Sequence, residues 1–269
     1  MRIFVAGLRK LERRMVTWIT FGLLVGLLAL ILVAVGATAK QQPTESGRAA
    51  SLLLLTFPGA YSFVLSFILG LGGLFAVIYG AAVAGSEWTW GTLKNAVARG
   101  ESRSRYIVMT FAAVALFMGL GLVLSYVIGI IVTILAANLA GIATDGLSDS
   151  ATLGKLPDEL ARGWLAVAEA GALGFAIATI ARSQLAGIGA GIGVYFGEQF
   201  ASIFLPDIVR YLPFNAANAV IARTPTAGEG GGGLVNPLAP DVALVVVSLW
   251  LVGALIVAAV FTERAEISG

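Results

Sequence analysis

Two acidic residues lie inside long apolar stretches, where a carboxylate indicates either a functional role or a structural partner that compensates its charge. Glu169 and Glu198 are the only acids well within segments that the hydropathy pattern predicts to cross a membrane. A charged side chain at the middle of such a helix costs about 2.5–3.5 kcal/mol on insertion scales. The two carboxylates could bind a cationic group of a substrate or a coupling ion. Alternatively, each is a structural acid paired with Arg162, Arg210 or backbone donors near the outer surface.

The segment from Gly80 to Arg105, GAAVAGSEWTWGTLKNAVARGESRSR, is the second place where polar residues interrupt apolar sequence. Trp90, Leu93 and Val97 recur at helical spacing and predict one apolar face. The polar residues of the segment are then expected to face solvent, namely Lys94, Asn95, Arg99, Glu101, Arg103 and Arg105. The pattern predicts a helix on the membrane surface with tryptophans at headgroup depth. Periodicity alone favours equally a topology anchor and a docking site for a cytoplasmic protein.

Composition and the absence of motifs argue against several other kinds of site. The 269 residues include no cysteine and no histidine, which excludes disulfides, thiolate chemistry and the commonest zinc sites. The sequence has no G-x-x-x-x-G-K-[ST] motif, so it predicts no P-loop for nucleotide phosphates, and the glycine run at 230–233 predicts a linker. No carboxylate pair, nucleophile–base set or metal cluster is apparent. The net charge of +2 gives no reason to expect a nucleic acid partner.

The elements that position these residues are predicted to be membrane-spanning helices. The chain is 58% hydrophobic and 12% charged, with a mean hydropathy of +0.93. Soluble domains are closer to half apolar and a quarter charged. Several runs exceed the ~20 apolar residues that cross a hydrocarbon core. The predicted fold class is an all-α, polytopic membrane protein, one transmembrane domain over 1–269, with six spans at about 15–37, 60–84, 106–139, 163–181, 185–205 and 241–261.

Shorter elements are predicted around these spans. Residues 1–14 read as an amphipathic helix on the membrane surface, with apolar residues at helical spacing among basic ones. A cleaved signal peptide is the alternative, but the apolar run that follows is longer than the ~7–15 residues of a signal sequence. Pro157 and the two acids after it predict a helix start. Residues 206–222 predict an interfacial or re-entrant segment.

An even number of spans places both termini on one side of the membrane. Eleven of the 17 Lys and Arg residues then fall on the side of the termini, in short segments. The positive-inside rule assigns that side to the cytoplasm, together with the connector that holds Glu87.

The connector resembles that of the ABC-2 type permeases, the six-span membrane subunits of bacterial ABC exporters. In that family an E-x-x-x-G-T-L segment follows the second span and an S-R pair precedes the third. Here Glu87, Gly91-Thr92-Leu93-Lys94 and Ser102-Arg103-Ser104-Arg105 match this pattern. The likeness covers nearly the whole chain in layout and about twenty-five residues in motif. The chain departs from the pattern at Ala98-Arg99-Gly100-Glu101, where an acid replaces an expected proline-like break.

The resemblance implies a cytoplasmic coupling helix over 86–100 that sits in a groove of a separate ATPase subunit. Its implied coupling residues are Glu87, Trp90, Gly91, Thr92, Leu93, Lys94, Arg99, Arg103 and Arg105. The chain would itself be no enzyme and hold no cofactor, since ATP and Mg would bind to the ATPase. The implied partners are that ATPase, a second permease copy or homologous permease, and the lipid bilayer of the bacterial cytoplasmic membrane, with both termini in the cytoplasm.

The predicted fifth span carries small residues four apart on overlapping faces, namely Gly187, Gly189, Gly191, Gly193 and Gly197. Such spacing allows close helix contact within the subunit or across a dimer. The mostly apolar spans favour an amphipathic or hydrophobic substrate. Two other functions stay open: an ATP-independent ion carrier or channel that uses Glu169 and Glu198, and a membrane anchor that recruits a protein through the connector.

Overall fold

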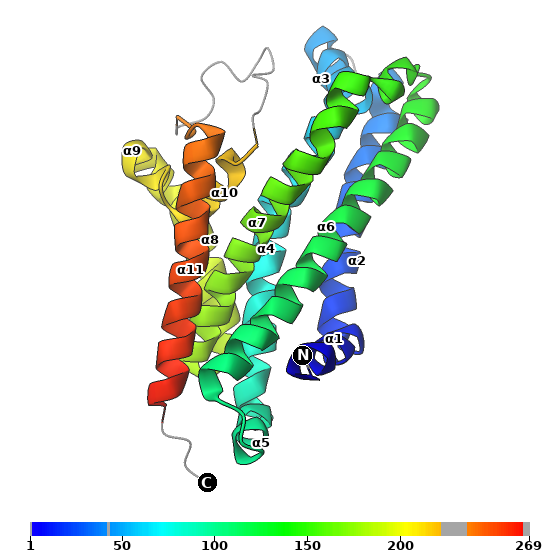
Figure 1. Ribbon diagram of the computed structural model, residues 1–269. Coiled ribbons are helices and arrows are strands. Elements are labelled where there is room, and N and C mark those ends of the chain that lie inside the picture. The colour runs from blue at the N-terminus through cyan, green and yellow to red at the C-terminus, as the bar shows by residue number, and fades with distance from the viewer. Residues whose placement is uncertain (1, 42–43, 222–235, 266–269) are drawn as a thin grey trace.

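The computed structural model describes residues 2–41, 44–221 and 236–265, which form helices and turns and no strand (Figure 1). Five helices among them are long and apolar enough to cross a membrane: α2 (Met15–Thr38, continued by the 3₁₀ turn η1, Ala39–Gln41), α4 (Gly59–Thr89), α6 (Arg103–Ala140), α7 (Ser150–Ala181) and α11 (Pro240–Arg264). The all-α prediction is confirmed for the described residues, and the five long apolar helices are consistent with a multi-pass membrane protein.

The predicted fifth span corresponds to α8 (Gln184–Phe204), which is not one of these five helices. Its five glycines, with Glu198 and Gln199, dilute an otherwise apolar sequence. The turn between α7 and α8 is as short as predicted: Arg182 ends α7 in the left-handed region at φ 51°, and the Ser183 hydroxyl accepts a hydrogen bond from the N–H of Ala186. A sixth crossing therefore stays a prediction.

The shorter helices connect the long ones. They are α1 (Arg2–Glu12), α3 (Glu45–Leu55), α5 (Thr92–Ala98), the 3₁₀ turn η2 (Asp145–Ser148), α9 (Pro206–Val209) and α10 (Pro213–Ala219). The predicted surface helix over 1–14 is α1, and the mixed segment 206–222 contains the two short helices α9 and α10. The predicted glycine linker at 230–233 lies outside the described residues.

The long helices run side by side between two ends of the bundle (Figure 1). Helices α4 and α7 lie in the middle, α2 and α6 on one side, and α8 and α11 on the other. Helices α1 and α5 and the described end of α11 meet at one end, which we call the α5 end, and α3 and α9 lie towards the opposite end. Most residues in the second halves of α4 and α7 are buried, whereas α2 and α11 expose much of their apolar surface.

Glycines bring the backbones of α4 and α7 into direct contact. A Cβ added to Gly80 would lie 2.1 Å from the carbonyl oxygen of Gly171, and one added to Gly174 would lie 2.1 Å from that of Val77. Small residues permit such close approach between membrane helices, where packing rather than water exclusion drives association. The backbones of α4 and α7 are therefore too close at these two positions to accept any residue with a side chain.

Helix α7 begins at Ser150, and the prediction that it begins at Pro157 is wrong. The side chain of Asp149 accepts a hydrogen bond of 3.0 Å from the N–H of Thr152 and so caps the helix earlier. Hydrogen bonds from the side chain and backbone of Thr152 lower the pKa of Asp149. Pro157 instead lies inside the helix, where its ring removes one backbone donor without ending the helix.

Candidate functional site at the α5 end

The connector between α4 and α6 contains a break that the sequence prediction of one helix over 86–100 missed. Helix α4 continues to Thr89, and Gly91 adopts the left-handed region at φ 64° before α5 starts at Thr92. A residue with a Cβ rarely adopts this conformation, so a glycine here separates the two helices. Gly100, at φ 85°, gives a second sharp turn between α5 and α6.

Glu87, in the last turn of α4, joins four helices. Its side chain is only 1% exposed. The Nζ of Lys10 on α1 lies 2.6 Å from one carboxylate oxygen, and Nη2 of Arg14 lies 3.1 Å from the same oxygen. The hydroxyl of Tyr106 on α6 donates to the other oxygen at 2.7 Å, and so does the hydroxyl of Thr92 on α5. We call these five residues the Glu87 cluster.

The Glu87 cluster combines one buried carboxylate with two cations. Arg14 also donates a hydrogen bond of 2.7 Å to the hydroxyl of Ser86, while Lys10 keeps partial contact with solvent. A carboxylate can accept about four hydrogen bonds, and Glu87 accepts four. Its burial is therefore compensated by both charge and hydrogen bonding, which is the condition for a stable buried ion pair.

A cavity of about 270 Å³ lies beside the Glu87 cluster, between α1, α4, α5 and α6. Lys10, Glu87, Arg99 and Glu101 supply polar groups to its wall. Helix α5 contacts the bundle chiefly through Leu93, which is 1% exposed. Helix α5 is thus held at a few points rather than packed along its whole length.

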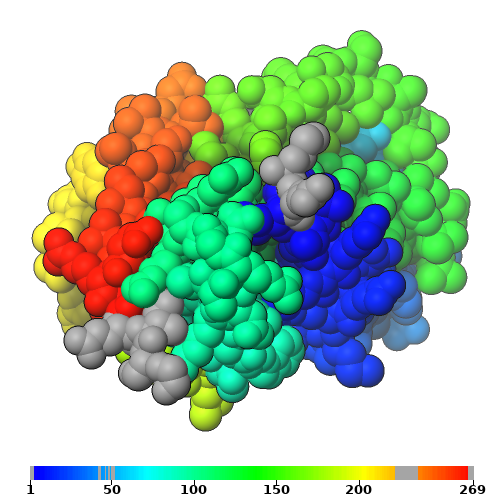
Figure 2. Space-filling model, turned by 60° about the horizontal axis from the view of Figure 1, so that its bottom comes forward, coloured from blue at the N-terminus to red at the C-terminus, as the bar shows by residue number. Residues whose placement is uncertain are grey.

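The outer side of the connector forms an exposed, basic surface at the α5 end. It consists of Trp90, Lys94, Asn95, Ala98, Arg99 and Arg105, which we call the α5 surface. Trp90 is 61% exposed, and the guanidinium of Arg14 lies 5.0 Å from the centre of its ring. In Figure 2 the connector occupies the middle of this face, between the blue of α1 and the red of α11. A partner approaching this end would meet the α5 surface directly.

The residues predicted to couple to an ATPase therefore do not all lie on one surface. Trp90, Lys94, Arg99 and Arg105 lie on the α5 surface, whereas Glu87 and Leu93 are buried. The buried residues can act on a partner only through the helices that they hold together.

Arg103 has a different position from the other basic residues of the connector. Its Nη1 donates to the backbone carbonyl of Ala265 at 2.7 Å and to that of Glu263 at 3.2 Å. The N–H of Ser104 donates to the Glu263 carboxylate at 3.0 Å. These bonds join the start of α6 to the end of α11, which makes Arg103 a structural residue of the α5 end.

Sequence reasoning missed Lys10, Arg14 and Tyr106 as members of this site. The two basic residues were read only as charges of the surface helix and as topology signals, and Arg14 lies in an extended link beyond the end of α1. Their partner is more than seventy positions away in the chain, at Glu87. Helical periodicity carries no information about such a pairing.

Glu198 has the structural partners that the sequence left as an alternative. One carboxylate oxygen accepts hydrogen bonds from the N–H groups of Phe214 and Asn215, at 3.1 and 3.2 Å, and from the Asn215 side chain at 3.1 Å. These donors lie in the first turn of α10, where Leu212 gives no side-chain cap. The acid of α8 thus caps the neighbouring helix.

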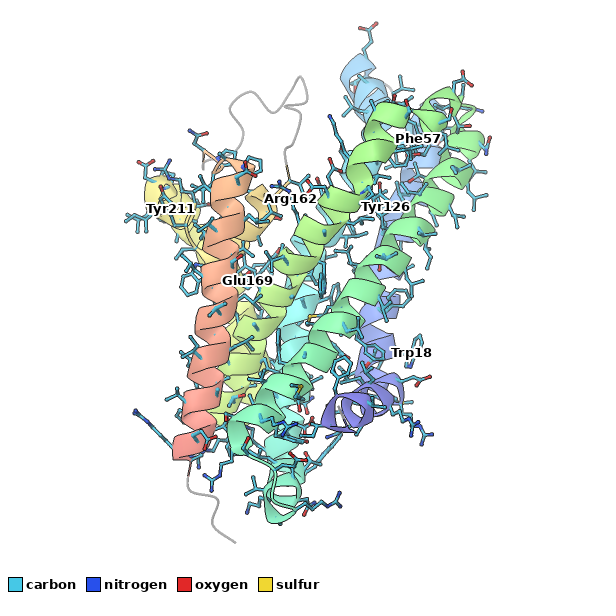
Figure 3. All side chains as sticks on the ribbon, in the orientation of Figure 1. Trp18, Phe57, Tyr126, Arg162, Glu169 and Tyr211 are labelled. Atoms are coloured by element: carbon cyan, nitrogen blue, oxygen red, sulfur yellow. The ribbon has the colours of Figure 1, made fainter. Side chains whose placement is uncertain are left out.

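Glu169 lies at mid-height in α7 and is fully buried (Figure 3). Within the described part of the chain, neither of its carboxylate oxygens has a hydrogen-bond partner. The pairing with Arg162 is wrong, because Arg162 binds Asp158 at 2.8 Å and Asp241 at 2.9 Å. A carboxyl group that is buried without a partner is costly in its charged form.

The five glycines of α8 divide between two faces. A Cβ on Gly187 would lie 2.4 Å from Ala178, and one on Gly191 would lie 2.3 Å from Val77, so both glycines serve packing within the subunit. Gly189, Gly193 and Gly197 have no neighbour within 4 Å of such a Cβ. They form an open stripe beside the exposed rings of Phe196 and Phe200.

Comparisons with known proteins give no family assignment. No protein-family model matches the chain, and no curated protein matches it.

Proposed function

We propose that the chain is the membrane-spanning permease subunit of an ATP-binding cassette exporter in a bacterial cytoplasmic membrane. A separate cytoplasmic ATPase subunit would dock on the α5 surface and hydrolyse ATP with Mg. The cargo would be an amphipathic or hydrophobic compound that leaves the cytoplasm. The sequence resemblance of the connector to ABC-2 type permeases motivates this proposal.

The observation that carries the proposal is the arrangement of the connector. A short basic helix, α5, is exposed at one end of a membrane bundle and is attached by Leu93 and the Glu87 cluster to α1, α4 and α6. A surface anchor would need only exposed basic and aromatic groups. A surface anchor would not require a buried carboxylate that links α5 to three other helices. Such a link is expected of a helix that transmits displacement to the bundle.

In this mechanism, closure of the ATPase displaces α5 relative to the membrane. The links on both sides of α5 are short, so the ends of α4 and α6 must follow. The backbone contact between α4 and α7 would carry the movement into the middle of the bundle. Export is directional only if the inward and outward states bind the cargo with different affinities.

A second permease copy would pack against α8. The open stripe of Gly189, Gly193 and Gly197 allows another helix to approach closely. Gly187 and Gly191 are excluded from this role by their contacts within the subunit.

Charge reversal on the α5 surface tests the docking proposal. Arg99 and Arg105 are exposed, and replacing both with Glu should abolish ATP-dependent export while the protein still inserts into the membrane. Reversal places like charges against the ATPase surface that fits the basic helix, and such contacts cost several kcal/mol. Export is measured in inverted vesicles that contain the ATPase, and insertion is measured by protease protection.

The matched control replaces the same two residues with Lys, which keeps their charge. We expect that variant to retain export and ATPase stimulation. Normal export by the Glu variant would remove the docking role of the α5 surface. Arg103 is left unchanged, because its bonds to the end of α11 would confound the result.

A second candidate function is an ATP-independent ion carrier, and the unpartnered carboxyl group of Glu169 favours it. Glu198 is less suited to an ion path, since it already caps α10. If Glu169 carries protons, Glu169→Gln should abolish proton flux in vesicles of purified protein. A flux that is absent in the unaltered protein, or unchanged in the variant, would eliminate this candidate.

A further inference from the structure

A second cavity opens on the membrane-facing side of the bundle. It has a volume of about 190 Å³ and lies between α2, α4 and α6, with Val167 of α7 at its back. Most of its lining surface is apolar, although four of its lining residues carry hydroxyl groups. An apolar cavity of this size stays free of water and accepts an apolar guest. We call it the α2–α6 groove.

Two glycines create the hollow. Gly72 on α4 and Gly121 on α6 line the groove without side chains. A Cβ on Gly121 would have its nearest neighbour, Phe21, at 3.9 Å, and one on Gly72 would meet Leu24 at 3.6 Å. A Cβ would therefore make only ordinary van der Waals contacts at both positions, in contrast to the backbone clashes at Gly80 and Gly174. A void left empty destabilises the protein in proportion to its volume.

The rim of the groove faces the hydrocarbon of the bilayer. Its outer residues include Leu120 and Leu124 of α6, both more than half exposed, and Trp18 of α2, which is 59% exposed. Figure 3 shows Trp18 at the outer edge of the bundle, beside α1. Because these helices cross a membrane, the molecules that surround the rim are lipid chains.

The groove begins at the level of the basic helix α1. Thr17 and Tyr79, which share a hydrogen bond of 3.1 Å, line its α1 end. The indole N–H of Trp18 donates to the carbonyl of Glu12, so the rim is joined to the last residue of α1. The side chain of Arg9 on α1 and that of Arg13, directly after α1, are both exposed. A polybasic segment at the membrane surface attracts anionic headgroups.

We propose that the α2–α6 groove holds one acyl chain of an anionic phospholipid from the leaflet next to α1, with its headgroup at Arg9 and Arg13. The chain fills the volume left by Gly72 and Gly121, and the two arginines select the headgroup charge. This site goes beyond the proposed function, because it stands whether or not an ATPase docks on the α5 surface.

Photolabelling of the intact protein in vesicles tests this proposal. The probe is phosphatidylglycerol with a photoactivatable diazirine in one acyl chain, and labelled peptides are identified by mass spectrometry. We expect the labels to concentrate on residues 17–24 and 117–125, which border the groove. Labels spread evenly over the exposed faces of α6 and α11 would overturn the proposal with no variant needed.

Filling the groove should remove these labels. Gly121→Leu should lose most of the labelling at 117–125, whereas the matched control Gly253→Leu, on an open face of α11, should keep it. Unchanged labelling in Gly121→Leu would overturn the acyl-chain site. Phosphatidylcholine with the same chain should label the groove less than phosphatidylglycerol does, and equal labelling by both lipids would overturn the role of Arg9 and Arg13.

Discussion

Replacing Glu87 with Gln should lower the free energy of unfolding by about 3–5 kcal/mol, the usual cost of breaking a buried ion pair on one side. The variant keeps the shape of the side chain but leaves Lys10 and Arg14 without their counter-charge, and of these two cations Arg14 is largely buried while Lys10 keeps partial contact with solvent. The thermal unfolding midpoint of the purified protein in mild detergent should fall by about 10 °C. The exposed acid Glu12 gives the matched control, since Glu12→Gln should leave the midpoint nearly unchanged.

A double substitution separates the charge effect from general damage. Adding Lys10→Met to Glu87→Gln removes the cation closest to the missing carboxylate. The two changes should therefore cost less together than the sum of their separate costs, because residues in one network do not act additively. Purely additive costs would show that Lys10 and Glu87 do not stabilise each other.

The second large effect is expected at the contact between α4 and α7. Gly80→Leu should destabilise the protein by about 3 kcal/mol or prevent folding, as overpacking does in a tight core. A side chain at Gly80 meets the backbone of Gly171, which cannot turn aside as a side chain could. The two helices would have to separate along their shared face.

The same substitution at Gly22 of α2 is the control, because a Cβ there has no neighbour within 4 Å. Both variants are compared by thermal unfolding and by the yield of monodisperse protein in detergent. If Gly80→Leu unfolds at the same temperature as Gly22→Leu, the close approach of α4 and α7 is not what holds the bundle.

The sequence was sufficient to predict the long helices but not all of their ends. Apolar runs and helical spacing place α2 and α6 within a few residues of their observed bounds. The start of α7 was missed because Pro157 looked like a first-turn proline, whereas the side chain of Asp149, eight residues earlier, caps the helix. The break at Gly91 was missed because apolar periodicity continues across it, from Trp90 to Leu93.

Pairings between distant residues were beyond the reach of periodicity. The connector was correctly recognised as polar, yet nothing in its spacing indicates that Glu87 faces inward towards Lys10. The glycines of α8 show the same limit. Residues four apart share one face of a helix, but the positions of the neighbouring helices determine which face is buried. Glu198 and Glu169 look alike in the sequence and differ only in what lies opposite them.

Docking of an ATPase on the α5 surface is tested most directly by isolating the tagged chain from its native membranes in mild detergent. Mass spectrometry then identifies and quantifies the proteins that remain bound. We expect an ATPase subunit with a P-loop in stoichiometric amount, and we expect it to be lost from the variant with Arg99→Glu and Arg105→Glu. Isolation of the chain without such a subunit, together with transport by the purified chain alone in vesicles, would contradict the proposed function.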